Sequence, residues 1–195
     1  SIGFAGVILQ LFFYGITTSW MLAAVTLVFV QMQLYAENLY TDELSGLYNR
    51  RYLNAVLAKR KTAGWKSLHG IMMDVNDFKH INDSLGHSIG DKAVSTMGSI
   101  LFRSIPDTGM AIRYAGDEFI VLLAGVDTEY VLATMDEIND NISQFNSSGA
   151  EPFSLSVSMG YAEFGSEDDA EVFLMHLRNM DEKMYEEKRK YHSLN

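Results

Sequence analysis

Carboxylate side chains stand at the ends of apolar segments in two parts of this sequence. Asp74 closes one apolar segment, and Asp117 and Glu118 lie in a short turn between two others. If these segments are neighbouring strands of one sheet, Asp74 and Asp117 come together, and paired carboxylates with substrate phosphates suit Mg²⁺. Each aspartate alone could be a turn former. Glu118 beside Asp117, with Asp74 predicted opposite, favours a metal site.

A polar segment follows Asp74. Lys79 could neutralise phosphate oxygens, and backbone N–H groups of the turn before it could bind them. A carboxylate accepts hydrogen bonds from the paired donors of a guanine edge, and an amide side chain both donates and accepts. Asn82 and Asp91 could read such an edge. The same residue types occur in any loop, so an ordinary loop is an open alternative.

Composition narrows the function further. The net charge of −10 argues against a nucleic-acid-binding surface, so no nucleic-acid partner is expected. The sequence has no cysteine, which excludes disulfides, thiolate metal sites and a cysteine nucleophile. A length of 195 residues suits one catalytic unit with an appendage.

The appendage is the N-terminal segment, because residues 1–36 contain no Asp, Glu, Lys, Arg or His. As one helix they would extend ~54 Å, against ~30 Å for a hydrocarbon core. Gly15 and the small hydroxyls of Thr17 to Ser19 predict a turn at a membrane surface, within residues 14–20. We therefore expect a partial first pass, 2–14, belonging to a larger membrane region, and a second span at about 19–35. A signal peptide and a buried soluble hairpin are the alternatives.

Basic residues after the second span indicate its orientation. Arg50, Arg51 and the basic cluster 59–61 place the C-terminal part in the cytoplasm by the positive-inside tendency. The expected location is therefore the inner (cytoplasmic) membrane, with residues 37–41 as a short helical linker.

Strand and helix patterns alternate after the linker. Strands are predicted at 68–74, 110–114, 118–123 and 153–161. Helices are predicted at 50–61, 91–103, 127–145 and 170–190. The order β-α-β-β-α-β predicts an α+β fold, with an antiparallel-containing central sheet and helices packed on one face.

Three ordered blocks resemble the GGDEF family of diguanylate cyclases. The run 42–51 (DELSGLYNRR) resembles the family's opening motif, 74–91 its first nucleotide-binding block, and 115–119 (AGDEF) its signature. Residues 181–188 match its closing segment. The resemblance covers 42–195 and implies the palm-like nucleotidyl cyclase fold.

Carried over by position, the resemblance assigns the metal site. It implies that Asp74, the Val75 carbonyl and Asp117 bind Mg²⁺ or Mn²⁺, two ions per half-site. Glu118 matches a second acidic position that serves or supports the metals in catalysis, and Gly116 would let the hairpin backbone approach the nucleotide.

The resemblance also assigns the substrate contacts. Asn82 and Asp91 would recognise guanine. The groups implied to bind the triphosphate are Lys79, Lys188 and the backbone amides of Asp77 and Phe78.

The activity implied is condensation of two GTP molecules into cyclic di-GMP. Each domain would bind one GTP, so a homodimer is required. Ala115 replaces the first signature glycine, which costs of order 1 kcal/mol if that position has a positive φ. The segment 191–193 replaces a Gly-Arg-Asn ending. A catalytically silent GTP-binding domain and a membrane transport or scaffold protein are the alternatives.

Overall fold

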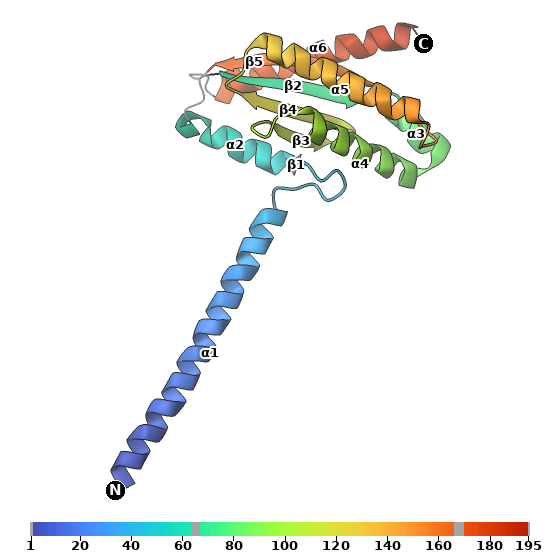
Figure 1. Cartoon of the computed structure of the whole chain (residues 1–195). Helices are drawn as coiled ribbons and strands as arrows, with labels where there is room; N and C mark the ends of the chain where they lie inside the picture. Colours follow the sequence, from blue (N-terminus) through green and yellow to red (C-terminus); the bar gives the residue numbers. More distant parts are fainter. Residues whose placement is uncertain (1, 64–66, 166–169, 195) are drawn as a thin grey trace. The chain divides into compact units, whose positions relative to one another are not determined.

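The computed structural model describes residues 2–63, 67–165 and 170–194 (Figure 1). The chain divides into two compact units, one ending at Leu39 and the other beginning at Tyr40. Each unit is described by itself.

The N-terminal unit is a single helix, α1 (Ile2–Asn38). The turn predicted within residues 14–20 is wrong, because these residues are helical. The Thr17 hydroxyl donates to the carbonyl oxygens of Phe13 and Tyr14, and Thr18 donates to that of Tyr14. Hydroxyls that bond back to the preceding turn are compatible with a continuous helix. The two-pass interpretation depended on that turn.

Within α1, the stretch Phe12–Gln33 is long and apolar enough to cross a membrane. It is 22 residues long, and none of it is buried in the protein. In the part of the chain that the structure describes, it is the one helix that meets these criteria.

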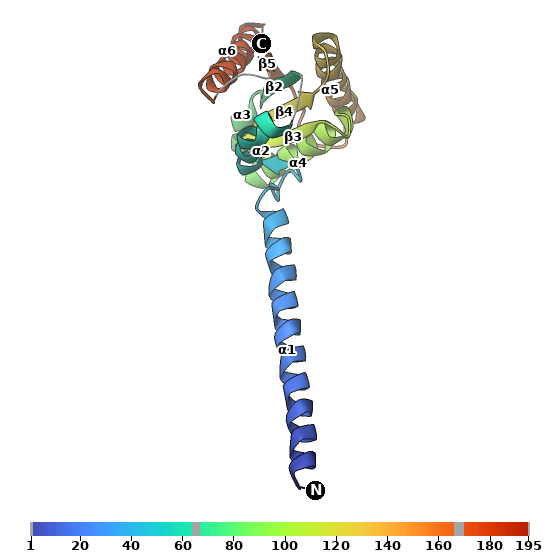
Figure 2. The ribbon, with the colours of Figure 1, turned by 90° about the vertical axis from the view of Figure 1, so that its left-hand side faces the viewer.

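The C-terminal unit is built on a five-stranded sheet in the order β1-β3-β4-β2-β5 (Figures 1 and 2). Strand β2 lies between β4 and β5 and is antiparallel to both, and β1 is parallel to β3. The predicted α+β class is confirmed, with a mixed sheet. The elements are β1 (Tyr48–Asn49), α2 (Arg50–Ala63), β2 (Ser67–Val75), α3 (Phe78–Leu85), α4 (His87–Ser104), β3 (Met110–Ala115), β4 (Glu118–Ala124), α5 (Thr128–Ser148), β5 (Val157–Gly165) and α6 (Ala170–Leu194).

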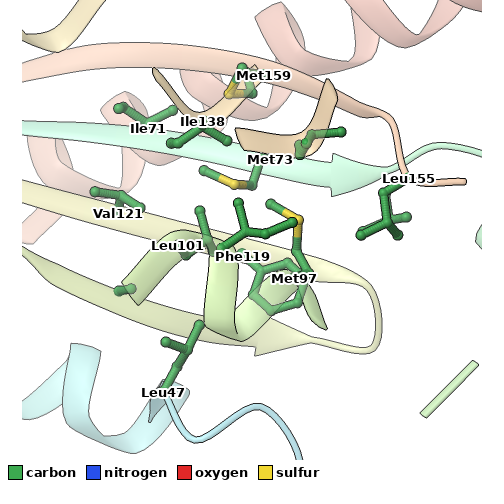
Figure 3. Packing of buried hydrophobic residues seen from close by; sticks show 14 of the residues in the cluster. Leu47, Ile71, Met73, Met97, Leu101, Phe119, Val121, Ile138, Leu155 and Met159 are labelled. Carbon is green, nitrogen blue, oxygen red and sulfur yellow. The ribbon is translucent and has the colours of Figure 1, made fainter. Parts of the chain in front are cut away.

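Helices cover both faces of the sheet, so the prediction that they pack on one face is wrong. On one face, Met73 and Phe119 of the strands pack with Met97 of α4 and Ile138 of α5 (Figure 3). On the other face the strands pack against α2 and α6, with Leu53, Met72, Ile120, Met180 and Met184 in the cluster. Both faces of β2 are therefore buried, and a strand buried on both sides reads as a continuous apolar run.

Two local predictions also differ from the structure. Residues 78–85 form helix α3, where only a loop was expected. Strand β5 begins at Val157, although the apolar pattern predicted a start at Phe153. The side chain of Asn146 binds both the backbone N–H and the carbonyl of Leu155, at 2.8 and 2.7 Å. The Leu155 side chain is buried, which explains the apolar pattern. Its backbone, however, is bonded to the Asn146 amide, and β5 begins only after it.

The loop that opens the second unit packs on α4 through Gly98. A Cβ at this position would lie 2.2 Å from the carbonyl oxygen of Ser45. Gly98→Ala should therefore lower the free energy of unfolding by about 1–3 kcal/mol, measured by urea unfolding of the detergent-solubilised chain. The matched control is Ser99→Ala on the exposed side of α4, which should change it by less than ~0.5 kcal/mol. Equal stability of Gly98→Ala and the parent would contradict this packing.

Candidate active site

The pairing of β2 with β4 brings the predicted carboxylates together. In this antiparallel pair Asp74 is opposite Glu118, and the Val75 N–H donates to the Asp117 carbonyl at 3.2 Å. Asp74 is buried, whereas Asp117 and Glu118 are partly exposed. The expected neighbourhood of Asp74 and Asp117 therefore exists at one end of the sheet.

Burial and neighbouring carboxylates raise the pKa values of Asp117 and Glu118. Burial raises the pKa of Asp117, and the charge of Asp74 raises it further. Burial also raises the pKa of Glu118, with contributions from the charges of Asp74, Asp117 and Asp181. The charge of Lys188 opposes both shifts. The surroundings of Asp117 and Glu118 thus disfavour their charged forms.

Lys188 reaches this cluster from α6. Met180, Met184 and Lys188 are four residues apart and therefore share one helix face. The two methionines are buried in the core beneath α6, and the Lys188 ammonium forms an ion pair with Asp74 Oδ1. Lys188, which was predicted to bind the triphosphate, therefore also contacts Asp74, which was predicted to bind metal.

The turn after β2 has the backbone form of an anion-binding site. Asp77 is the residue before the first turn of α3 and has φ 54° and ψ 22°, a left-handed conformation that Asp tolerates better than most residues. The amides near this helix start carry a partial positive charge. Lys79 is exposed on the first turn of α3, and His192 of α6 lies 3.8 Å from Asp77 Oδ1. The amides of Asp77 and Phe78, which the sequence predicted as phosphate donors, therefore lie at the start of a helix.

The predicted guanine-reading residues lie on the two helices on either side of the junction between α3 and α4. Asn82 is partly buried, and its Oδ1 lies 3.3 Å from Nδ1 of His87. A Cβ on Gly90 would lie 2.0 Å from that oxygen, so a larger residue here would displace the Asn82 amide from its present position. Asp91 is the next residue of α4 and is exposed. Asn82 thus lies beside Gly90, the residue that precedes Asp91.

Arg113 is a site residue that sequence reasoning missed. Its Nη1 donates to both carboxylate oxygens of Asp42, at 3.1 and 3.2 Å, and its Nε donates to the Gly116 carbonyl at 2.9 Å. Asp42 in turn accepts from the backbone and hydroxyl of Ser45. Although burial opposes it, these bonds hold the pKa of Asp42 below its ordinary value. The sequence feature that could have indicated this role is an arginine within the otherwise apolar segment 110–115.

The turn residues of the hairpin are compatible with its backbone. Gly116 has φ 38°, and a Cβ there would meet no atom within 4 Å, so backbone conformation is what favours glycine. Asp77 is the one non-glycine residue with positive φ in the described chain, so Ala115 has none. The backbone cost considered for Ala115 does not arise.

The donor set at this end of the sheet consists of oxygen atoms, which suits a hard divalent cation. Among the described residues, no three Asp, Glu, His or Cys side chains form a ready metal cluster. Two carboxylates and a backbone carbonyl would need substrate phosphates to complete the coordination, as Mg²⁺ sites commonly do. The mutual repulsion of the carboxylates is a second feature that a cation would relieve.

Comparison with known proteins places the chain in a family. Residues 39–193 match the family described as "Diguanylate cyclase, GGDEF domain". The chain therefore belongs to the GGDEF diguanylate cyclase family. It is 31% identical over 154 residues to the response regulator PleD of Caulobacter vibrioides, and 29% identical over 154 residues to the diguanylate cyclase DosC of Escherichia coli. Each alignment covers 76% of this chain and about a third of the relative, 34% and 33%.

Solved structures show the same fold. The coiled coil and GGDEF domain of DgcB from Caulobacter crescentus, solved with c-di-GMP, has a TM-score of 0.76 at 23% identity. That match covers 86% of this chain and 90% of the DgcB chain. The GGDEF domain of YfiN from Pseudomonas aeruginosa has a TM-score of 0.63 at 27% identity and covers 75% and 92% of the two chains.

The carboxylate cluster should destabilise the fold at neutral pH. Folding raises the pKa of Asp117, so its charged form is disfavoured in the native state. This cost builds up as pH rises above the ordinary aspartate pKa and is complete above the raised pKa. In a metal-free buffer, Asp117→Asn should therefore raise the urea midpoint at pH 7.5. The gain should shrink as pH falls toward the ordinary aspartate pKa of about 3.9.

The matched control is Asp140→Asn on the exposed side of α5, which should change stability by less than ~0.5 kcal/mol. A lower midpoint for Asp117→Asn at pH 7.5 would mean that the Asp117 charge is not repelled in the fold.

Arg113 should hold the hairpin closed. Arg113→Met removes the bond to the Gly116 carbonyl and the ion pair with Asp42. Because a bond to a charged group contributes about 1.5–3 kcal/mol, the amides of residues 114–118 should exchange with deuterium at least about tenfold faster. Arg103→Met, at the exposed end of α4, should leave their exchange unchanged. Unchanged exchange in Arg113→Met would show that the hairpin does not depend on this side chain.

Proposed function

We propose that this chain is an active diguanylate cyclase, which condenses two GTP molecules into cyclic di-GMP with release of two pyrophosphates. The observation that carries the proposal is the placement of Asp74 opposite Glu118 and beside Asp117, with the Lys188 ammonium on Asp74. Membership of the GGDEF family gives this arrangement its reaction class.

The metal site would use Asp74, the Val75 carbonyl and Asp117. Two Mg²⁺ or Mn²⁺ ions per half-site would supply Lewis-acid activation of the α-phosphate and lower the pKa of the attacking 3′-hydroxyl. Glu118 would support this site through its charge, since it lies directly across the strand pair from Asp74.

The chain's own groups would hold the nucleotide. Lys79 and Lys188 would neutralise phosphate oxygens, and the amides of Asp77 and Phe78 would donate to them at the start of α3. Gly116 has open space above it, which would allow the hairpin backbone to approach the nucleotide closely.

Guanine would be recognised at the junction of α3 and α4. The Asp91 carboxylate would accept from the two neighbouring N–H donors of guanine, and the Asn82 amide would pair with the base edge. Adenine presents a different donor and acceptor pattern, so this pair of side chains would select GTP.

Catalysis would require two copies of the domain. In each half-reaction the 3′-oxygen of one GTP forms a bond to the α-phosphorus of the other, the bond to pyrophosphate breaks, and the hydroxyl proton leaves to solvent. Because each domain holds one GTP, a homodimer with two-fold symmetry would bring the two nucleotides together.

The N-terminal helix would anchor this dimer in the cytoplasmic membrane. Phe12–Gln33 has the required length and apolarity, and the basic residues from Arg50 onward favour a cytoplasmic catalytic domain. The proposed organisation is a membrane segment at 1–36, a linker at 37–41 and a catalytic domain at 42–195.

A silent GTP-binding regulatory domain is the second candidate, and the observation behind it is Ala115 in place of the signature glycine. Ala115 is exposed and has no positive φ, so its methyl group imposes no backbone strain. This favours an active enzyme over a silent one.

Product analysis separates the two candidates. The detergent-solubilised chain incubated with GTP and Mg²⁺ should form cyclic di-GMP, detected by mass spectrometry. Asp117→Ala should form none while keeping its near-ultraviolet circular dichroism, and Asp107→Ala, on the exposed turn before β3, should keep full activity. GTP binding without any cyclic dinucleotide, even in a forced dimer, would favour the silent domain.

Base recognition gives a further test. Asp91→Ala removes an acceptor of two hydrogen bonds, so KM for GTP should rise about 10- to 100-fold with a smaller change in kcat. Asp83→Ala, on the exposed side of α3, is the matched control and should leave KM unchanged. A large loss in kcat with normal KM would show that Asp91 does not read the base.

A further inference from the structure

Lys188 and the proposed metal ions require the same carboxylate, that of Asp74. The Lys188 ammonium is paired with Asp74 Oδ1. The Asp74 side chain is only 10% exposed and that of Lys188 is 26% exposed, so the pair is shielded from water. Under the proposed function, on which this inference rests, Asp74 is a metal ligand. An ammonium and a divalent cation cannot both bind this buried carboxylate without strong repulsion.

We infer that Lys188 is an exchangeable counter-ion that couples metal binding to nucleotide binding. While it is paired with Asp74, it neutralises the carboxylate and repels an incoming divalent ion. A triphosphate offers the ammonium a stronger anionic partner. Transfer of Lys188 from Asp74 to phosphate would free the carboxylate for metal at the moment when phosphate oxygens can complete its coordination.

The surroundings of Lys188 restrict this exchange to its side chain. Helix α6 is fixed beside β5, because the Glu187 carboxylate accepts from the Met159 N–H and the Lys183 ammonium donates to the Tyr161 carbonyl. Met184, one turn before Lys188, is buried in the core. A lysine side chain is a flexible four-carbon stem and can change partners over several ångströms without movement of the backbone.

The remaining charges near the pair favour the exchange. The charges of Asp74, Asp117 and Asp181 act on Glu118, that of Asp74 acts on Asp117, and Lys188 partly offsets the repulsion at both Asp117 and Glu118. A divalent ion that replaced Lys188 would offset this repulsion more strongly. A positive charge would therefore offset the acids in both states: the Lys188 ammonium before the exchange and the metal ion after it.

Metal binding in the absence of nucleotide tests the inference directly. Mn²⁺ is titrated by calorimetry into the detergent-solubilised, nucleotide-free chain and its variants. Lys188→Met should bind Mn²⁺ at least about tenfold more tightly than the parent, because a competing positive charge is removed. Lys188→Arg keeps the charge and should remain as weak as the parent. Lys190→Met, an equal loss of charge on the exposed side of α6, should also match the parent.

A double variant separates failure of this inference from failure of the proposed function. Adding Asp74→Asn to Lys188→Met should remove the tight Mn²⁺ binding, which assigns the gain to Asp74. Equal or weaker Mn²⁺ binding by Lys188→Met would overturn the counter-ion role, whether or not the parent makes cyclic di-GMP. Tighter binding that survives Asp74→Asn would place the metal elsewhere and overturn it as well. If Lys188→Met gains affinity but the parent makes no product, the proposed activity fails and the inference stands.

Discussion

The register between β2 and β4 is the constraint on which the site depends. The pairs run without a break from Leu68 opposite Ala124 to Asp74 opposite Glu118. Because side chains alternate between the two faces, a slip of one residue would turn Asp74 toward the apolar core beneath α4 and α5. The register is fixed by apolar side chains on both faces of β2, so core packing determines where the acids meet.

The same arrangement carries an energetic conflict. Burial and the charge of Asp74 disfavour ionised Asp117 and Glu118, yet the proposed metal site would need both as charged oxygen ligands or supports. Lys188 offsets part of this repulsion, and α6 delivers it by packing Met180 and Met184 into the core. The carboxylates thus lower the stability of the fold at one end of the sheet, and the apolar cores on its two faces offset this cost. Such a trade of stability for function is common at functional sites.

Much of the fold followed from local patterns. Each strand predicted in the C-terminal unit has a counterpart, because buried strands give apolar runs with turn residues at their ends. The errors have identifiable causes. Helix α3 is only eight residues long, so its apolar residues Phe78, Ile81 and Leu85 repeat over little more than two turns, and its first residues follow a left-handed Asp77. The start of β5 was misjudged because Asn146, nine residues before Leu155 in the sequence, takes the backbone bonds of that residue.

The sequence by itself determined the family, the residue types of the candidate site and the apolar character of the N-terminal segment, since these lie in contiguous runs of residues. Tertiary structure alone decided the contacts between residues distant in sequence. It paired Lys188 with Asp74, and it joined Arg113 both to Asp42 and to the hairpin carbonyl of Gly116. Such contacts depend on strand order and helix placement, which arise from packing of the whole domain and leave no local pattern in the sequence.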